Sequence, residues 1–147
     1  MDRTKYRIVL VENNVADVMI ISLALREAAP CDITVLSDGE KAFQYFQSVV
    51  MDSKTFPELV ILDLNLPIRD GTEVLDFIRS HTRLSAIPVA VVSSSPRDVM
   101  KGRAARADCY VTKSTDLDKY LAIGKELVEC IKRSEGQNVV PGNSSEL

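Results

Sequence analysis

Short runs of apolar residues recur five times along the chain, and each run has the length of one β-strand. Strands of a parallel sheet are buried on both faces, so they appear in a sequence as continuous apolar runs and not as an alternation of apolar and polar positions. Proline, glycine, aspartate or serine marks the ends of the runs, as expected for strand boundaries. The predicted strands cover residues 7–11, 32–36, 59–63, 88–92 and 109–112.

Segments of helical length separate the predicted strands, and their apolar residues follow the i, i+3, i+4 spacing of amphipathic helices. Capping signals mark several of the predicted starts. Asn14 precedes the first helix, and Asp70 followed by Glu73 is a variant of the capping box. Thr115 with Asp118 repeats this pattern before the last helix. The predicted helices cover residues 15–29, 39–51, 71–80, 97–106 and 116–133.

This alternation of strands and helices predicts an α/β fold. Right-handed crossovers place helices on both faces of a doubly wound parallel sheet, and the five predicted strands suit the flavodoxin-like order 2-1-3-4-5. A length of 147 residues leaves room for one domain. We expect that domain to span residues 1–133, followed by a flexible tail over residues 134–147, where the composition becomes polar.

The composition is that of a globular protein, because 46% of the residues are hydrophobic and 27% are charged. A net charge of -3 does not favour a nucleic acid as partner. The apolar runs are too short for a signal peptide or a membrane span, so we expect a cytoplasmic protein without membrane contact. The three cysteines, Cys31, Cys109 and Cys130, are widely spaced without a C-x-x-C pair, and we expect reduced thiols. The single histidine, His81, argues against Ser-His-Asp chemistry and multi-histidine metal sites.

Polar side chains follow four of the predicted strands at the edge where open α/β sheets bind ligands. Taken singly, each of these residues is equally well explained as the start of a loop. Their convergence from four distant segments is the functional signal. The residues are Glu12 and Asn13 after the first strand, Asp63 at the end of the third, Ser93 after the fourth and Lys113 after the fifth.

This set of side chains suits phosphoryl transfer. Asp63 follows an apolar run, where an unpaired carboxylate is costly without a cation or a donor. Two acids near loop carbonyls suit a hard cation such as Mg2+, with Mn2+ as the alternative ion. Beside that metal, Asp63 could attack phosphorus as a nucleophile, while Lys113 and Ser93 stabilise charge on the phosphoryl oxygens.

The same residues, in their order and spacing, resemble the receiver domains of two-component response regulators. The resemblance covers about residues 5–133 and is specific because four motifs coincide. The middle motif and the stretch before the third strand also resemble the regulators that serve phytochrome-type histidine kinases. The motifs are Ile8-Val9-Leu10-Val11-Glu12-Asn13-Asn14, Leu62-Asp63-Leu64-Asn65-Leu66-Pro67-x-x-Asp70-Gly71, Pro88-Val89 leading to Ser93-Ser94-Ser95, and Tyr110-x-x-Lys113.

The resemblance implies a role for each matching residue. It makes Asp63 the phosphoacceptor, Lys113 the phosphoryl-binding lysine, Ser93 the switch hydroxyl and Tyr110 the switch aromatic. The implied metal ligands are Glu12, Asn13, Asp63 and the backbone carbonyl of Asn65, and the side chains of Asn65 and Ser95 are implied to tune the phosphate lifetime.

The resemblance also implies what surrounds the protein. It implies a stand-alone phosphoacceptor that accepts phosphate from the phosphohistidine of a sensor histidine kinase and then changes its contacts with a downstream protein. Such a protein is not an enzyme apart from its own phosphorylation and dephosphorylation. The last predicted helix has more apolar residues than one stripe needs, which suggests a homodimer through the face of the fourth helix, fifth strand and fifth helix. These apolar residues are Tyr120, Leu121, Ile123, Leu127, Val128 and Ile131.

Two positions depart from the family pattern. Asn13 stands where the family usually has an acid, which predicts weaker Mg2+ binding. Ser114 stands where the family usually has a proline after a cis bond, so we predict a trans Lys113–Ser114 bond. These departures keep open a binding module that works without phosphate. An aspartate-nucleophile phosphatase is a remote alternative, because Asn65 occupies the position where such enzymes need a second acid.

Overall fold

The computed structural model describes residues 5–52, 56–94 and 107–134, together with the backbone of residues 135–144. The predicted helix over residues 97–106 and the candidate residue Ser95 lie outside these described residues.

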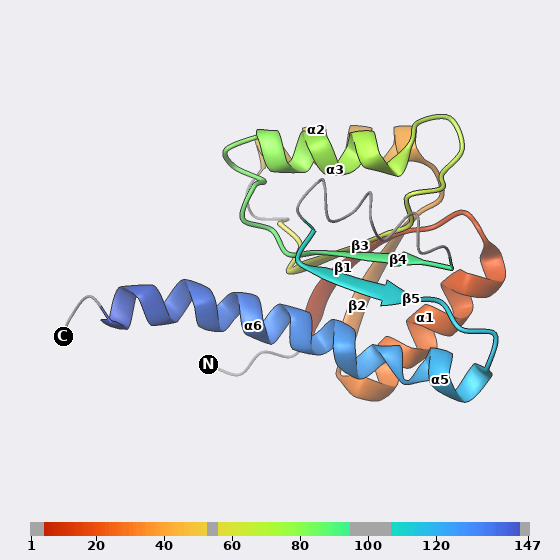
Figure 1. Ribbon diagram of the computed structural model, residues 1–147. Coiled ribbons are helices and arrows are strands. Elements are labelled where there is room, and N and C mark those ends of the chain that lie inside the picture. Colours follow the sequence, from red (N-terminus) through yellow and green to blue (C-terminus); the bar gives the residue numbers. More distant parts are fainter. Residues whose placement is uncertain (1–4, 53–55, 95–106, 145–147) are drawn as a thin grey trace.

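Five parallel strands form one sheet in the order β2-β1-β3-β4-β5, which confirms the predicted topology (Figure 1). Each strand begins and ends within a residue of its prediction, and the signal is clearest for β3 and β4, which are buried throughout. The strands are β1 (Tyr6–Val11), β2 (Cys31–Leu36), β3 (Leu59–Leu62), β4 (Val89–Ser93) and β5 (Cys109–Thr112).

Helices cover both faces of the sheet. Figure 1 shows α2 and α3 on one face and α1, α5 and α6 on the other. The first three match their predictions closely. The helices are α1 (Val15–Ala28), α2 (Gly39–Met51), α3 (Gly71–Ser80), α5 (Leu117–Leu121) and α6 (Ile123–Ser144).

The last predicted helix differs from the structure at both ends and in its middle. Asp116, and not Thr115, is the N-cap, and its side chain accepts a hydrogen bond from the backbone N–H of Lys119. A residue with shallow helical dihedrals, Ala122, separates α5 from α6. The helix then runs to Ser144, beyond the predicted end at residue 133. The prediction ends the helix where the apolar periodicity stops. A helix that has already formed can extend further, because each added residue contributes another backbone hydrogen bond.

The core has two halves, because alternate residues of each strand face opposite sides of the sheet. Ile8 and Leu10 of β1 pack with residues of α1 and α6. Val9 and Val11 of the same strand pack with residues of α2 and α3. The central strands β1 and β3 are therefore apolar on both faces at their carboxyl ends, where polar residues follow them.

Nearly all of the apolar residues that suggested a homodimer belong to the core. Tyr120, Ile123, Leu127, Val128 and Ile131 are buried within the chain, and Leu121 packs against the same cluster. Among the side chains that the structure describes, these six residues thus form no surplus apolar face, and the homodimer loses the observation on which it rested. None of the helices in the described part of the chain has the length and apolar content that a membrane span requires.

The expectation of three reduced thiols is wrong. Cys109 and Cys130 form a disulfide that joins β5 to α6, with 6.4 Å between their Cα atoms. Cys31 is a free, buried thiol. The spacing of the cysteines along the chain cannot reveal this pair, because the pairing depends on which face of α6 meets the start of β5.

Gly71 allows α3 to begin against the end of β3. A Cβ atom at this position would lie 2.5 Å from the backbone oxygen of Asp63 and 2.6 Å from the Cα of Leu64. Because both neighbours are backbone atoms, we expect Gly71→Ala to lower the free energy of unfolding by about 2 kcal/mol, measured by urea denaturation. Asp76→Ala, at an exposed position of α3, is the control and should change it by less than about 0.5 kcal/mol. Equal effects of the two substitutions would contradict the steric account.

Candidate functional site

The carboxyl ends of the strands bring distant polar residues to one edge of the sheet. Val11 of β1 pairs with Leu62 of β3, so Glu12 and Asp63 follow side by side. The backbone N–H of Asp63 donates to the oxygen of Val11 at 3.1 Å. On the other side, the backbone N–H of Lys113 donates to the oxygen of Ser93 at 2.8 Å, which fixes the position of Lys113 beside β4.

The Lys113 ammonium lies among three carboxylates. Its Nζ is 3.0 Å from Oε1 of Glu12, 2.9 Å from Oδ2 of Asp17 and 3.2 Å from Oδ2 of Asp63. The side chains of Lys113, Glu12 and Asp63 are 12%, 1% and 8% exposed, so water screens these charges little. The site is therefore a nearly buried cation held by an excess of negative charge.

This charge excess changes the protonation of the site. Burial, and then the charge of Asp63, raise the pKa of Glu12 to about 7. Burial acts to lower the pKa of Lys113, but its hydrogen bonds to Asp17 and Glu12 and the charges of Glu12 and Asp63 outweigh burial and raise that pKa. Lys113 thus stays protonated, and the site retains the capacity to bind further positive charge.

Asp17 belongs to the site although the strand ends do not include it. It lies in the first turn of α1, whose N-cap residue Asn14 accepts a hydrogen bond from the backbone N–H of Asp17 at 2.9 Å. One carboxylate oxygen contacts Lys113, and the other accepts a hydrogen bond from the hydroxyl of Tyr120 at 2.7 Å. A helix that starts directly after a strand presents its first turn to the same edge, and this rule would have identified Asp17.

Tyr120 connects α5 to the site through Asp17. Burial, the hydrogen bond to Asp17 and the nearby negative charges raise the pKa of Tyr120, so its hydroxyl remains a donor. We expect Tyr120→Phe to lower the free energy of unfolding by about 2 kcal/mol in urea denaturation, because the bond goes to a charged group. Tyr110→Phe is the matched control, since the Tyr110 hydroxyl donates to the neutral carbonyl of Ala107 at 2.9 Å, and should cost about 1 kcal/mol. A larger loss for Tyr110→Phe would contradict the account.

The two candidate switch residues lie on neighbouring strands. Ser93 is buried at the end of β4. Tyr110 is half-buried on β5, where it packs against the core half that includes residues of α2 and α3. The register pairs Val91 with Tyr110 and Ser93 with Thr112, so Ser93 and Tyr110 are two positions apart along the strand pair.

The loop after β3 carries the other candidate residue beside Asp63. The backbone N–H of Asn65 donates to Oδ1 of Asp63 at 2.9 Å, which orients the carboxylate. Further along, Arg69 contacts Glu40 at 3.1 Å, so α2 anchors this loop. Ile68 has a φ of 71°, an unfavourable value for a β-branched residue, and the anchored loop holds it there.

The segment after Lys113 differs from the family pattern as predicted. The described peptide bonds are all trans, including Lys113–Ser114. The hydroxyl of Ser114 accepts a hydrogen bond from the backbone N–H of Asp116 at 3.0 Å. The trans bond therefore leads directly into the N-terminus of α5.

The donor atoms of the site fit a hydrated hard cation. The available oxygens are the carboxylates of Glu12 and Asp63, the amide oxygen of exposed Asn13 and the carbonyl of Asn65. Among the described residues, no group of three or more His, Cys, Asp or Glu side chains is arranged to hold a metal. Mg2+ keeps several waters and needs only one or two carboxylates, so the donor set suits Mg2+ better than a metal that needs a full protein cage.

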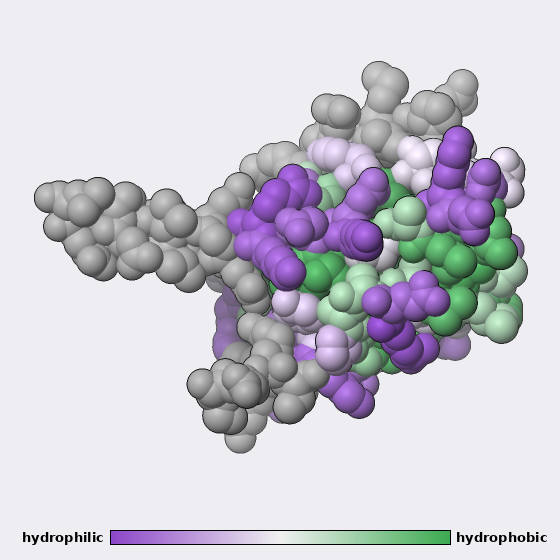
Figure 2. All heavy atoms as spheres, turned by 90° about the horizontal axis from the view of Figure 1, so that it is seen from below, coloured by the Kyte–Doolittle hydropathy of each residue, from purple (hydrophilic) through white to green (hydrophobic). Residues whose placement is uncertain are grey.

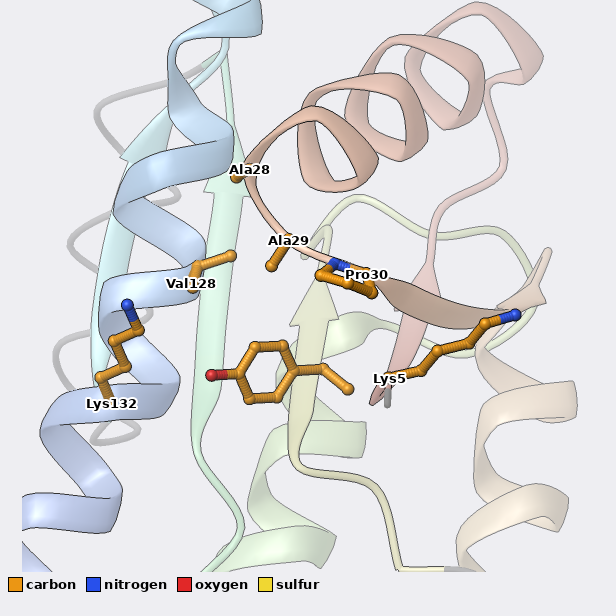
Figure 3. Close-up of a pocket in the computed structure, with 7 residues that line it drawn as sticks. Lys5, Ala28, Ala29, Pro30, Val128 and Lys132 are labelled. Atoms are coloured by element: carbon orange, nitrogen blue, oxygen red, sulfur yellow. The ribbon is translucent and has the colours of Figure 1, made fainter. Parts of the chain in front are cut away.

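A pocket at the opposite edge of the sheet does not share this chemistry. The pocket has a volume of about 260 Å³. Lys5 and Lys132 lie at opposite ends of the pocket and do not form a common anion cradle (Figure 3). The pocket is lined by Lys5, Tyr6, Ala28, Ala29, Pro30, Val128 and Lys132.

The sequence matches known proteins over most of its length. A family profile described as the response regulator receiver domain matches residues 8–125. The chain is 35% identical over 114 residues to response regulator Rcp1 of Synechocystis sp., which covers 75% of this chain and 78% of Rcp1. It is 34% identical over 125 residues to the probable methanogenesis regulatory protein FilR2 of Methanothrix harundinacea, covering 83% of this chain and 81% of that protein.

The fold also matches solved structures. A crystal structure of the phosphorylated cyanobacterial phytochrome response regulator RcpA superposes with a TM-score of 0.76 at 36% identity, covering 85% of this chain and 92% of RcpA. The Mn(2+)-bound form of Rcp1 superposes with a TM-score of 0.72 at 32% identity, covering 82% of this chain and 90% of that chain.

Proposed function

The chain belongs to the response regulator receiver domain family of two-component systems, and we propose that it is a phosphorylation-dependent switch whose phosphoacceptor is Asp63. The observation that carries this proposal is the contact of Lys113 Nζ with Oδ2 of Asp63 and Oε1 of Glu12 at one end of the sheet. An isolated acid at this depth would be costly, whereas this arrangement places a cation beside the attacking oxygen.

The chemistry is a direct displacement at phosphorus. A carboxylate oxygen of Asp63 forms the new P–O bond while the P–N bond of the donor phosphohistidine breaks, and the electron pair of that bond returns to the imidazole nitrogen. Lys113 stays protonated and stabilises the charge on the phosphoryl oxygens. Ser93 donates its hydroxyl to one of those oxygens, and Tyr110 responds to the movement of Ser93.

A divalent cation completes the site. We propose Mg2+, held by Glu12, Asn13, Asp63 and the backbone carbonyl of Asn65, and the Mn(2+)-bound structure of Rcp1 supports a divalent metal. When bound, the metal supplies charge neutralisation of the phosphoryl group. The side chains of Asn65 and Ser95 are proposed to tune the lifetime of the acyl phosphate.

The phosphoryl donor is proposed to be a histidine kinase of the phytochrome type. The similarity to RcpA, a phytochrome response regulator, supports this class of partner. The exposed face of α1, the helix whose first turn contributes Asp17 to the site, carries the apolar side chains of Val15, Met19 and Leu23. Figure 2 shows apolar side chains gathered toward the end of the molecule where α1 and α5 lie. Such a patch suits a protein partner, and we propose that phosphorylation also alters contacts with a downstream protein.

Phosphorylation by a small-molecule donor tests the proposed function. With Mg2+ and acetyl phosphate, the wild type should gain one phosphoryl group, detected by intact-protein mass spectrometry. Asp63→Asn should gain none, while Asp76→Asn, at an exposed position of α3, should behave like the wild type. Equal labelling of all three proteins, or of none, would overturn the proposal.

Asn13 favours a second candidate function, a receiver-like module that binds its partner without phosphate. The Asn13 amide provides one formal charge fewer than the usual acid. We therefore expect the site to bind its metal more weakly and Asp63 to be phosphorylated more slowly. If the wild type stays unlabelled while Asn13→Asp is labelled at Asp63, the second candidate is the better account.

A further inference from the structure

The Cys109–Cys130 disulfide lies outside the phosphoryl site and next to a cation. Cys109 is the first residue of β5, and Cys130 lies in the part of α6 that packs on the sheet. Nη2 of Arg133 donates to Sγ of Cys109 at 2.9 Å. A guanidinium beside a sulfur favours the thiolate over the thiol, and the thiolate is the reactive form in thiol–disulfide exchange.

A small surface hollow adjoins the pair. Its volume is about 50 Å³, and its lining includes both cysteines, Arg133 and Ser134. Asp108 also lines the hollow, but its carboxylate is paired with Arg79 at 2.6 Å, so its charge is compensated. Glu126 and Glu129 line an adjoining pocket together with Cys109 and Arg133, so it is the direct contact with Arg133, and not the net charge of the surroundings, that favours the Cys109 thiolate. Cys130 is the more deeply buried sulfur, with 2% of the residue exposed against 7% for Cys109.

From this arrangement we propose that Cys109 and Cys130 are a reversible dithiol–disulfide pair, which exchanges with low-molecular-weight disulfides and thiols and thereby fastens α6 to β5 or releases it. The two elements hold the cysteines together through core packing, so the reduced pair remains positioned to close again. The pair is thus a modification site that is separate from Asp63.

The exchange balances in two steps. The Cys109 thiolate attacks one sulfur of a small disulfide such as oxidised glutathione, forms a mixed disulfide and expels one glutathione thiolate. The Cys130 thiolate then attacks Sγ of Cys109 and expels the second. The two protein thiols lose two electrons and two protons, and the small disulfide gains them as two thiols.

Closing the pair constrains the segment that carries Lys113 and Tyr120. Both residues lie between Cys109 and Cys130, which are separated by 21 positions. A cross-link around such a loop restricts its conformational freedom. Oxidation would thereby hold α5 and the start of α6 more firmly against the sheet, whether or not Asp63 is phosphorylated.

The third cysteine provides a matched control. Cys31 is buried, and its thiol donates to the carbonyl of Ala29 at 3.2 Å. Burial raises the pKa of Cys31, so its thiolate is scarce. Replacement of Cys31 by alanine should leave the exchange unchanged.

A glutathione redox titration of the folded protein tests the proposal. Free thiols are alkylated and counted by mass spectrometry after equilibration at a series of ratios of reduced to oxidised glutathione. We expect two alkylated cysteines to appear and disappear together in the wild type and in Cys31→Ala. Cys130→Ser should trap one glutathionyl group on Cys109, whereas Cys109→Ser should trap little. A pair that stays oxidised in excess reduced glutathione, or stays reduced in excess oxidised glutathione, would overturn the proposal.

Two further measurements separate a reactive pair from a merely structural bond. Arg133→Gln should slow oxidation by oxidised glutathione about threefold. Without the guanidinium a smaller fraction of Cys109 is thiolate, and the higher nucleophilicity of the remaining thiolate offsets only part of that loss. Reduction should speed amide hydrogen exchange in α6, with no such change in Cys130→Ser, and circular dichroism checks that each variant is folded. An unchanged oxidation rate in Arg133→Gln, or unchanged exchange on reduction, would contradict the corresponding part of the proposal.

Discussion

Replacing Lys113 with methionine should lower the free energy of unfolding by about 3 kcal/mol in the absence of divalent metal, because it leaves buried carboxylates without their cation. Glu12, Asp17 and Asp63 all lie within 3.2 Å of Lys113 Nζ. Protonation of Glu12 reduces this loss of stability, since the pKa of Glu12 is already raised to about 7 in the wild type. Urea denaturation at neutral pH measures the loss.

The same variant should respond more strongly to Mg2+ than the wild type. A divalent cation replaces part of the missing positive charge, so added Mg2+ should restore more stability to Lys113→Met. Phosphorylation by acetyl phosphate should be lost, because the cation beside the phosphoryl oxygens is gone. Lys119→Met, at an exposed position of α5, is the control. If Lys119→Met and Lys113→Met destabilise equally, Lys113 does not hold the site together.

Asn13→Asp should tighten Mg2+ binding about tenfold, since it adds a formal charge at a position that offers an oxygen to the metal. Without metal, the same substitution should destabilise the protein, because it places another acid next to Glu12 and near Asp63. The opposite signs of the two effects distinguish metal binding from a general change in stability. Isothermal titration calorimetry measures the affinity, and urea denaturation of the metal-free protein measures the stability.

Asn14→Asp is the matched control for this prediction. Asn14 caps α1 by accepting the backbone N–H of Asp17, and an aspartate preserves that bond. The substitution therefore adds the same charge one residue away. Its effect on Mg2+ affinity should stay below about threefold, because a solvent-screened charge that does not ligate the metal contributes little. Equal tightening by both variants would mean that Asn13 does not ligate the metal.

The sequence predicts the fold of the described residues well because its strongest signal has a simple cause. The stretches of β1 and β3 that are buried on both faces, Ile8–Val11 and Leu59–Leu62, contain only apolar residues, so the carboxyl ends of these strands are visible as the ends of apolar runs. The site follows from the same fact, since Glu12 and Asp63 are the first polar positions after such runs and Lys113 comes directly after β5. The topology then brings them together.

Other features depend on contacts that no local pattern reveals. Asp17 looks like an ordinary first-turn acid until the fold brings the start of α1 to Lys113. The Cys109–Cys130 pair requires the rotation of α6 about its axis, which apolar spacing alone does not fix. Apolar residues such as Leu127 and Val128 suggested a free surface, but α6 packs against both the sheet and α1 and buries them. Tertiary packing decides each of these cases.

The central claim is that Asp63 is the phosphoryl acceptor of a metal-dependent site. The most direct measurement is a calorimetric titration with the phosphoryl analogue beryllofluoride in the presence of Mg2+, on the wild type beside Asp63→Asn. We predict saturable binding of one analogue per chain to the wild type, dependent on Mg2+, and no binding to Asp63→Asn. Failure of the folded wild type to bind the analogue at saturating Mg2+, or equal binding by Asp63→Asn, would contradict the account.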